Sequence, residues 1–115
     1  MVRDYKAEVK RLTEIARKQG YNVRFDWDND TWRGMNPEAA KWLRKHKEYG
    51  SCRGRTPTRT ILISKSEHNN KLKSQTLRHE IIENKLMKNN GHSYPTAHRR
   101  SCRLQSSHKP LREKY

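Results

Sequence analysis

The chain has 115 residues, which allows one domain and leaves no room for a second core of useful size. Only 30% of the residues are hydrophobic and 34% are charged, and Leu, Ile, Val and Phe together number 17, so any core is small. No apolar run approaches the ~18 residues that span a bilayer, and the N-terminal MVRDYKAEVKR lacks the apolar centre of a secretory signal.

These absences lead us to expect a cytoplasmic protein without a membrane partner. Cys52 and Cys102 have no C-x-x-C spacing, so neither a disulfide framework nor a zinc ribbon is indicated, and both are expected to be reduced thiols. The formal net charge of +15 predicts attraction to polyanions, with nucleic acid as a possible partner. The alternative is that the excess of Lys and Arg only keeps a small protein in solution.

The first half of the chain contains two predicted helices and one predicted strand. Residues 5–19 have apolar positions at helical spacing, with Asp4 as the cap and Gly20 as the stop. Residues 21–27 alternate between apolar and polar, which is typical of a strand with one buried face. Asn36 and Pro37 begin a second helix, which we expect Gly50 to close.

The second half of the chain begins with a basic loop, residues 51–58, and a short β-branched strand, residues 59–64 (RTILIS). After a polar turn, a long helix is expected from about residue 71 to 88, with Asn89-Asn90-Gly91 as its left-handed stop. A last helix is expected from the cap Ser93 to about residue 104. The sequence therefore predicts a single α+β domain over residues 1–104, with about four helices on a small sheet, and a flexible basic tail over 105–115.

The long predicted helix carries two polar residues within an apolar stripe. At 100° per residue, Glu83 lies about 40° from His79, and Leu72, Ile82 and Leu86 flank them. A buried imidazole or carboxylate without a partner costs on the order of 1 to 3 kcal/mol. A metal ion would satisfy both groups, because side chains four apart on a helix project side by side.

A third ligand is expected from the last helix. His98 is the candidate, because the short connection at Gly91 folds that helix back on the long one. His92 is less suitable, since it lies in the turn. Glu80 is about 100° from His79 around the helix, where a carboxylate can accept a proton from water beside the metal.

The segment with the strand RTILIS, a polar turn and the helix T-L-R-H-E-I-I-E resembles the core of small zincin-type metallopeptidases, over about residues 59–102. The resemblance implies a zinc-dependent hydrolase with His79 as a metal ligand and Glu80 as the catalytic base. It also implies that the adjacent strand pairs with an extended peptide substrate. The chain departs from the H-E-x-x-H motif at Glu83, which stands where the family has its second histidine. With His98, it would give a His/Glu/His set of the kind that catalytic zinc sites use.

Two other interpretations of the same residues remain open. In the first, His79 and Glu83 form an ion pair, Glu80 is solvated or pairs with Asn84 or Arg78, and no metal binds. In the second, Cys102, four residues after His98, is an extra ligand that closes a structural zinc site.

Two basic clusters offer a nucleic-acid surface, or are simply solvated. One contains Arg53, Arg55, Arg59 and Lys65, and the other Arg99, Arg100, Arg103, Lys109 and Arg112. We assign Trp27, Trp32 and Trp42 to the core. Two alternatives to the peptidase follow: a basic nucleic-acid-binding protein without enzyme activity, and a metal-dependent nuclease that uses the same His and Glu residues.

Overall fold

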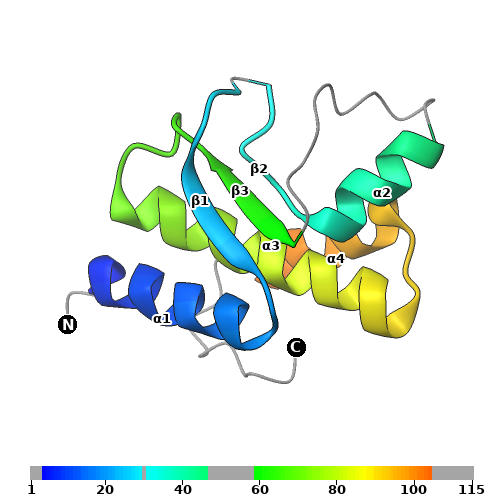
Figure 1. The fold of residues 1–115 in the computed structure, drawn as a ribbon, viewed down its shortest axis with the longest axis horizontal. Coiled ribbons are helices and arrows are strands. Elements are labelled where there is room, and N and C mark those ends of the chain that lie inside the picture. The colour runs from blue at the N-terminus through cyan, green and yellow to red at the C-terminus, as the bar shows by residue number, and fades with distance from the viewer. Residues whose placement is uncertain (1–3, 30, 47–58, 105–115) are drawn as a thin grey trace.

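The computed structural model describes residues 4–29, 31–46 and 59–104. These residues form four helices and three strands in the order α1 (Tyr5–Lys18), β1 (Asn22–Trp27), β2 (Gly34–Met35), α2 (Pro37–Lys45), β3 (Thr60–Ser64), α3 (Asn70–Asn90) and α4 (Tyr94–Leu104) (Figure 1). None of the described helices is long and apolar enough to cross a membrane. The predicted α+β class is confirmed, with the helices packed on a small mixed sheet.

The sheet has the strand order β1-β3-β2. β3 runs parallel to β1 and antiparallel to β2, so its backbone is paired on both sides. The resemblance had implied that this strand pairs with an extended peptide, and that expectation is wrong, because β3 has no free edge. β2 escaped the sequence analysis because two residues are too few to show an alternating pattern.

Opposite faces of β3 pack on different helices, because successive side chains of a strand point in opposite directions. Ile61 and Ile63 belong to the larger core cluster, which includes residues of α1 and α3. Leu62 packs with Met35 and with residues of α2. Trp27, Trp32 and Trp42 are partly buried against this second cluster, as expected for core residues.

Two of the predicted helix caps, Asp4 and Asn36, are confirmed, and Asn69, which was not predicted as a cap, begins α3 in the same way. Asp4, Asn36 and Asn69 each accept a hydrogen bond from a backbone N–H three residues later. Gly91 ends α3 with a φ of 67°. The predicted end of the second helix is wrong. α2 stops at Lys45, where the N–H of His46 bonds to the carbonyl of Trp42 and the two rings stack 3.8 Å apart, whereas Gly50 lies outside the described residues.

α3 is the central helix of the fold, and its neighbours bury it on several sides rather than along one stripe. It contacts α1, α2, α4 and the strands β2 and β3. Every residue from Leu77 to Asn84 is buried as a result. After Gly91, α4 returns along α3, and Arg78 Nε donates to the carbonyl of Leu104 at 2.9 Å. This return places the middle of α4 beside the middle of α3.

Candidate metal centre

Four side chains from α3 and α4 meet at one point, and we call them the candidate metal centre: His79, Glu80, Glu83 and His98. The three residues of α3 are 6%, 4% and 1% exposed, in that order, whereas the side chain of His98 is 47% exposed. The structure therefore brings together all four residues that the sequence singled out for chemistry. One side of the cluster is closed by the protein interior, and the other is open at His98.

Glu83 lies between the two imidazoles. Its Oε2 atom is 2.8 Å from His79 Nε2 and 3.0 Å from His98 Nδ1. The rings of His79 and His98 have centroids 4.8 Å apart and meet edge to face. An ion bound here would exchange these two contacts for metal bonds, with both imidazoles and one carboxylate oxygen already adjacent.

A residue that the sequence analysis treated only as a helix cap completes the cluster. Asn36 Nδ2 donates to Glu80 Oε1 at 2.9 Å and to Glu83 Oε1 at 3.0 Å, and Asn36 is fully buried. One amide thus holds Oε1 of each carboxyl group and leaves Oε2 of each on the side of the imidazoles. No signal in the sequence could find this role, because α2 and α3 are far apart along the chain.

The two carboxyl groups have opposite pKa shifts. Burial, and next the charge of Glu83, raise the pKa of Glu80 to about 8. Burial also acts to raise the pKa of Glu83, but hydrogen bonds from His79 and His98 outweigh it, and the pKa lies below its ordinary value. The metal-free protein therefore keeps one carboxylate ionised and the other protonated near neutral pH.

Neither carboxylate has a Lys or Arg partner in the part of the chain that the structure describes; the ion pairs of Glu80 and Glu83 are with histidines alone. Arg78 lies nearby on α3 but contacts Leu104 and Glu8 instead. Ionising both of these buried carboxyl groups without a permanent cation is costly, and a bound divalent ion would let both ionise.

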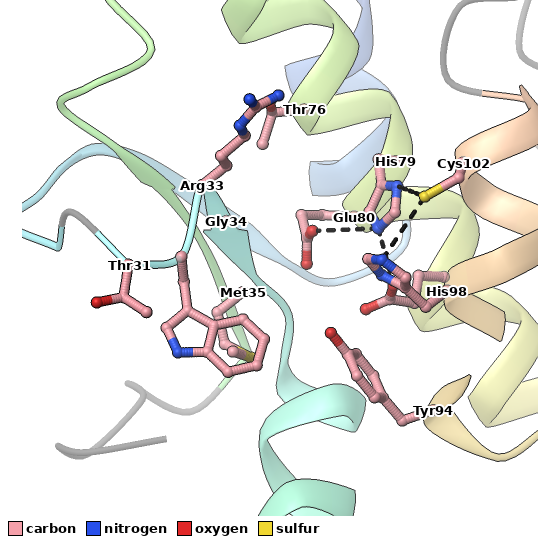
Figure 2. Close-up of a pocket in the computed structure, with 12 residues that line it drawn as sticks. Thr31, Arg33, Gly34, Met35, Thr76, His79, Glu80, Tyr94, His98 and Cys102 are labelled. Carbon is pink, nitrogen blue, oxygen red and sulfur yellow. Dashed lines mark hydrogen bonds and ion pairs between the residues drawn. The ribbon is translucent and has the colours of Figure 1, made fainter. Parts of the chain in front are cut away.

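The candidate metal centre opens into a cavity of about 410 Å³. Gly34 and Met35 of β2 lie across it from His79 and Glu80, and the hydroxyl of Tyr94 points into it (Figure 2). Burial, with the charges of Glu83 and Glu80 as lesser causes, raises the pKa of Tyr94 and keeps its phenol protonated. Tyr94 is a second residue that sequence reasoning missed.

Gly34 is required by the close packing of β2 on α3. A Cβ atom at this position would lie 2.9 Å from Thr76 Cγ2 and 3.0 Å from Glu80 Cγ. The absence of a side chain therefore lets the backbone of an edge strand approach Glu80 directly.

Cys102 lies on the other side of the two imidazoles. Its Sγ atom is 3.6 Å from His98 Nε2 and 4.0 Å from His79 Nδ1, and the residue is an exposed free cysteine (Figure 2). Among the described residues, two sets of possible ligands have their ligand atoms within 4.8 Å of one another. They are His79, Glu80 and Glu83, and His79, His98 and Cys102. His79 belongs to both.

The alternative interpretation, in which His79 and Glu83 form an ion pair and no metal binds, agrees with the structure in one respect and not in another. The contact between His79 and Glu83 that it requires is present at 2.8 Å. Its expectation for Glu80 is wrong, because Glu80 is buried and bonded to Asn36, whereas Asn84 Oδ1 accepts a hydrogen bond from the N–H of Glu38.

The remaining predicted residues lie outside the cluster. His92 is in the turn before α4, with its N–H bonded to the carbonyl of Leu86. Arg59 is exposed just before β3, and Arg99, Arg100 and Arg103 are exposed on α4. Arg53, Arg55, Lys109, Arg112, Cys52 and the tail 105–115 lie outside the described residues.

Comparison with known proteins adds no relative: no family model matches the chain, and no curated protein or solved structure matches it.

Proposed function

We propose that this chain is a zinc-dependent hydrolase of the metallopeptidase-like kind, acting in the cytoplasm. The observation that carries the proposal is the pair of buried carboxylates, Glu80 and Glu83, which face imidazoles and have no Lys or Arg partner among the described residues. Imidazole nitrogens and carboxylate oxygens are a donor set that zinc accepts in catalytic sites. The partial resemblance to small zincin-type metallopeptidases assigns His79 as a metal ligand and Glu80 as the catalytic base, and Glu83 stands where that family has its second histidine.

In this proposal His79, Glu83 and His98 hold the ion. Asn36 fixes Oε1 of Glu83, so Oε2, the atom already between the two imidazoles, is the one that binds. When bound, zinc polarises a substrate carbonyl and lowers the pKa of an attacking water molecule. Three protein ligands would leave zinc room for a water molecule or a substrate, and the cavity begins at these residues beside the half-exposed His98.

Glu80 is the proposed general base. Its Oε1 is held by Asn36, and its Oε2 lies 3.8 Å from His79 Nε2, on the side where the ion would bind. The free oxygen can take a proton from water and return it to the leaving amine. A cation beside Glu80 would lower its pKa from about 8 and ionise it for this task.

An extended peptide is the proposed substrate, and the strand that receives it is β2 rather than β3. The carbonyl of Arg33 accepts a hydrogen bond from Ser64, so the backbone of Gly34, one residue later, faces away from β3. Gly34 also lines the cavity together with Glu80, so this edge of β2 borders the space beside the candidate metal centre. A peptide that pairs with this edge would present its carbonyl groups to the candidate metal centre.

The test is a cleavage assay with fluorescence-quenched peptides and zinc-loaded protein. We expect Glu80→Gln to bind zinc as the wild type does and to lose at least ~100-fold in kcat, because the amide cannot accept the proton. Glu14→Gln, an exposed carboxylate on α1, serves as the matched control and keeps its activity. Equal cleavage by Glu80→Gln and wild type would refute the role of Glu80.

A further inference from the structure

An open surface pocket lies along one face of α4 beside the candidate metal centre, and its described lining residues all belong to that helix. It has a volume of about 700 Å³ and shares three residues, Tyr94, His98 and Cys102, with the cavity already described. Its other lining residues are Pro95, Arg99 and Arg103. We call it the α4 groove. A ligand bound in it would end at the opening of the candidate metal centre.

The charge of the α4 groove is positive, and no acidic group in the described part of the chain pairs with it. Arg99 and Arg103 are exposed and lie one turn apart, and neither has an ion pair among the described residues. The sequence has no Asp or Glu between Glu83 and Glu113, so this part of the chain contributes basic residues only. Glu80 and Glu83 are nearby, but both are buried and their partners are imidazoles.

The partly buried ring of Tyr94 lines the shared opening, and Trp32 lies beside it in the cavity. Tyr94 belongs to the α4 groove and to the cavity, and Trp32 lines the cavity with its ring centroid 6.4 Å from that of Tyr94. Flat aromatic faces beside arginines are the features with which proteins bind single-stranded nucleic acid: bases stack on the rings, and cations hold the phosphates. An acidic peptide would use the arginines but has no bases to stack.

We infer that the α4 groove binds single-stranded nucleic acid, with Arg99 and Arg103 on its phosphates and Tyr94 under a base. The bound nucleic acid would pass beside the candidate metal centre. The proposed hydrolase would then act while it is bound to nucleic acid. This binding does not depend on the proposed zinc chemistry, since it uses no metal ligand except the exposed face of His98.

The test is fluorescence anisotropy with a labelled oligothymidylate, in EDTA, at several salt concentrations. We expect the double variant Arg99→Glu, Arg103→Glu to weaken binding at least ~tenfold at ~0.15 M salt. The slope of log Kd against log salt should fall by about 1.4, which is the value for losing two phosphate contacts on a single strand. The matched control is Arg17→Glu with Lys18→Glu, the same charge change on exposed positions of α1 outside both cavities. The control should weaken binding less than about threefold and keep the slope.

Two further variants separate stacking from charge. Tyr94→Phe should retain binding, whereas Tyr94→Leu should weaken it at least ~fivefold, as expected when a ring supports a base. If the glutamate double variant fails to fold, as judged by circular dichroism, Arg99→Gln with Arg103→Gln replaces it.

Several results would overturn the inference. The inference fails if the two double variants weaken binding equally, or if Tyr94→Leu binds as the wild type does. It also fails if the wild type does not bind at ~0.15 M salt, or if oligoglutamate of equal charge displaces the labelled oligonucleotide as well as oligothymidylate does. Nucleic-acid binding is measured in EDTA, without metal, whereas zinc chemistry is measured by peptide cleavage with zinc-loaded protein. The two properties are therefore tested separately. If the chain takes up no zinc in buffer without chelator and still binds the oligonucleotide, the proposed function is refuted and this inference stands.

Discussion

Asn36 and Glu83 are 47 residues apart in the sequence, and a hydrogen bond of 3.0 Å joins them in the interior. The same amide group donates to Glu80 at 2.9 Å, and the side-chain oxygen of Asn36 accepts from the N–H of Ala39 at the start of α2. A single side chain thus begins one helix and orients two carboxylates on another. Groups that orient metal ligands in this way commonly affect metal affinity by about 10- to 100-fold.

Asn36→Ser tests this relationship. Serine caps a helix about as well as asparagine, so α2 should still form, but the short hydroxyl cannot reach both carboxylates. We expect zinc affinity, measured by competition with a chromophoric chelator, to fall about 10- to 100-fold while helix content by circular dichroism is unchanged.

The matched control for Asn36→Ser is Asn69→Ser. Asn69 caps α3 in the same manner but contacts none of the four residues of the candidate metal centre. Zinc affinity should stay at the wild-type value in this variant. Equal affinity in Asn36→Ser and the wild type would show that Asn36 is a cap alone.

Gly34→Ala should disturb Glu80 directly. The new methyl group would lie 2.9 Å from Thr76 Cγ2 and 3.0 Å from Glu80 Cγ, so one of these side chains must move. We expect a loss of about 1 to 3 kcal/mol in the free energy of unfolding, measured with denaturant, and reduced peptide cleavage.

Thr76→Ser provides the partner for a double-mutant cycle with Gly34→Ala. Serine removes Cγ2 and retains the hydroxyl that donates to Glu67 Oε1. We expect the double variant to recover at least ~0.5 kcal/mol of the loss, because the two positions interact in the folded state. Strict additivity of the two changes would contradict this packing.

The stability of the metal-free protein should fall as pH rises. The pKa of Glu80 is about 8 in the folded state against an ordinary value of 4.5, so between these values the folded state binds more protons than the unfolded state. The free energy of unfolding therefore decreases with pH over this window, by at most ~1.4 kcal/mol per pH unit for one proton.

Glu80→Gln isolates this effect, because its amide stays neutral at every pH. Denaturant unfolding in EDTA at about pH 5 and pH 8 should show a weaker pH dependence in Glu80→Gln than in the wild type, and higher stability of the variant at pH 8. Parallel curves for the two proteins would mean that Glu80 does not titrate in this range.

Cys102→Ser distinguishes a catalytic zinc site from a closed structural one. Cys102 Sγ is 3.6 Å from His98 Nε2 but is exposed, and His98 Nδ1 already faces Glu83. We expect zinc affinity to change less than about threefold and peptide cleavage to persist, because the proposed ligand set needs no thiolate. Loss of zinc as complete as in a histidine variant would indicate the closed site instead.

Local patterns in the sequence predicted most of the fold. Caps, glycines and periodicity near residues such as Asp4, Asn36 and Gly91 depend on neighbours a few positions away, and all three act as expected. The short connection after α3 was enough to bring His98 to Glu83. The sequence therefore predicted the features that depend on segments adjacent in the chain.

Features that depend on distant segments could not be predicted. β2 exists only because Gly34 and Met35 pair with β3, and Asn36 meets Glu80 only through the packing of α2 on α3. The central place of β3 in the sheet follows from the same long-range pairing. These contacts make the candidate metal centre a product of three helices and an edge strand rather than of one motif.

Zinc content by native mass spectrometry tests the central proposal most directly. Protein purified without chelators should contain one zinc ion per chain, as should His92→Ala, whose histidine lies in the turn before α4. His79→Ala, Glu83→Gln and His98→Ala should contain none. Wild-type protein without zinc after incubation with the ion, or His98→Ala with as much zinc as His92→Ala, would contradict the account.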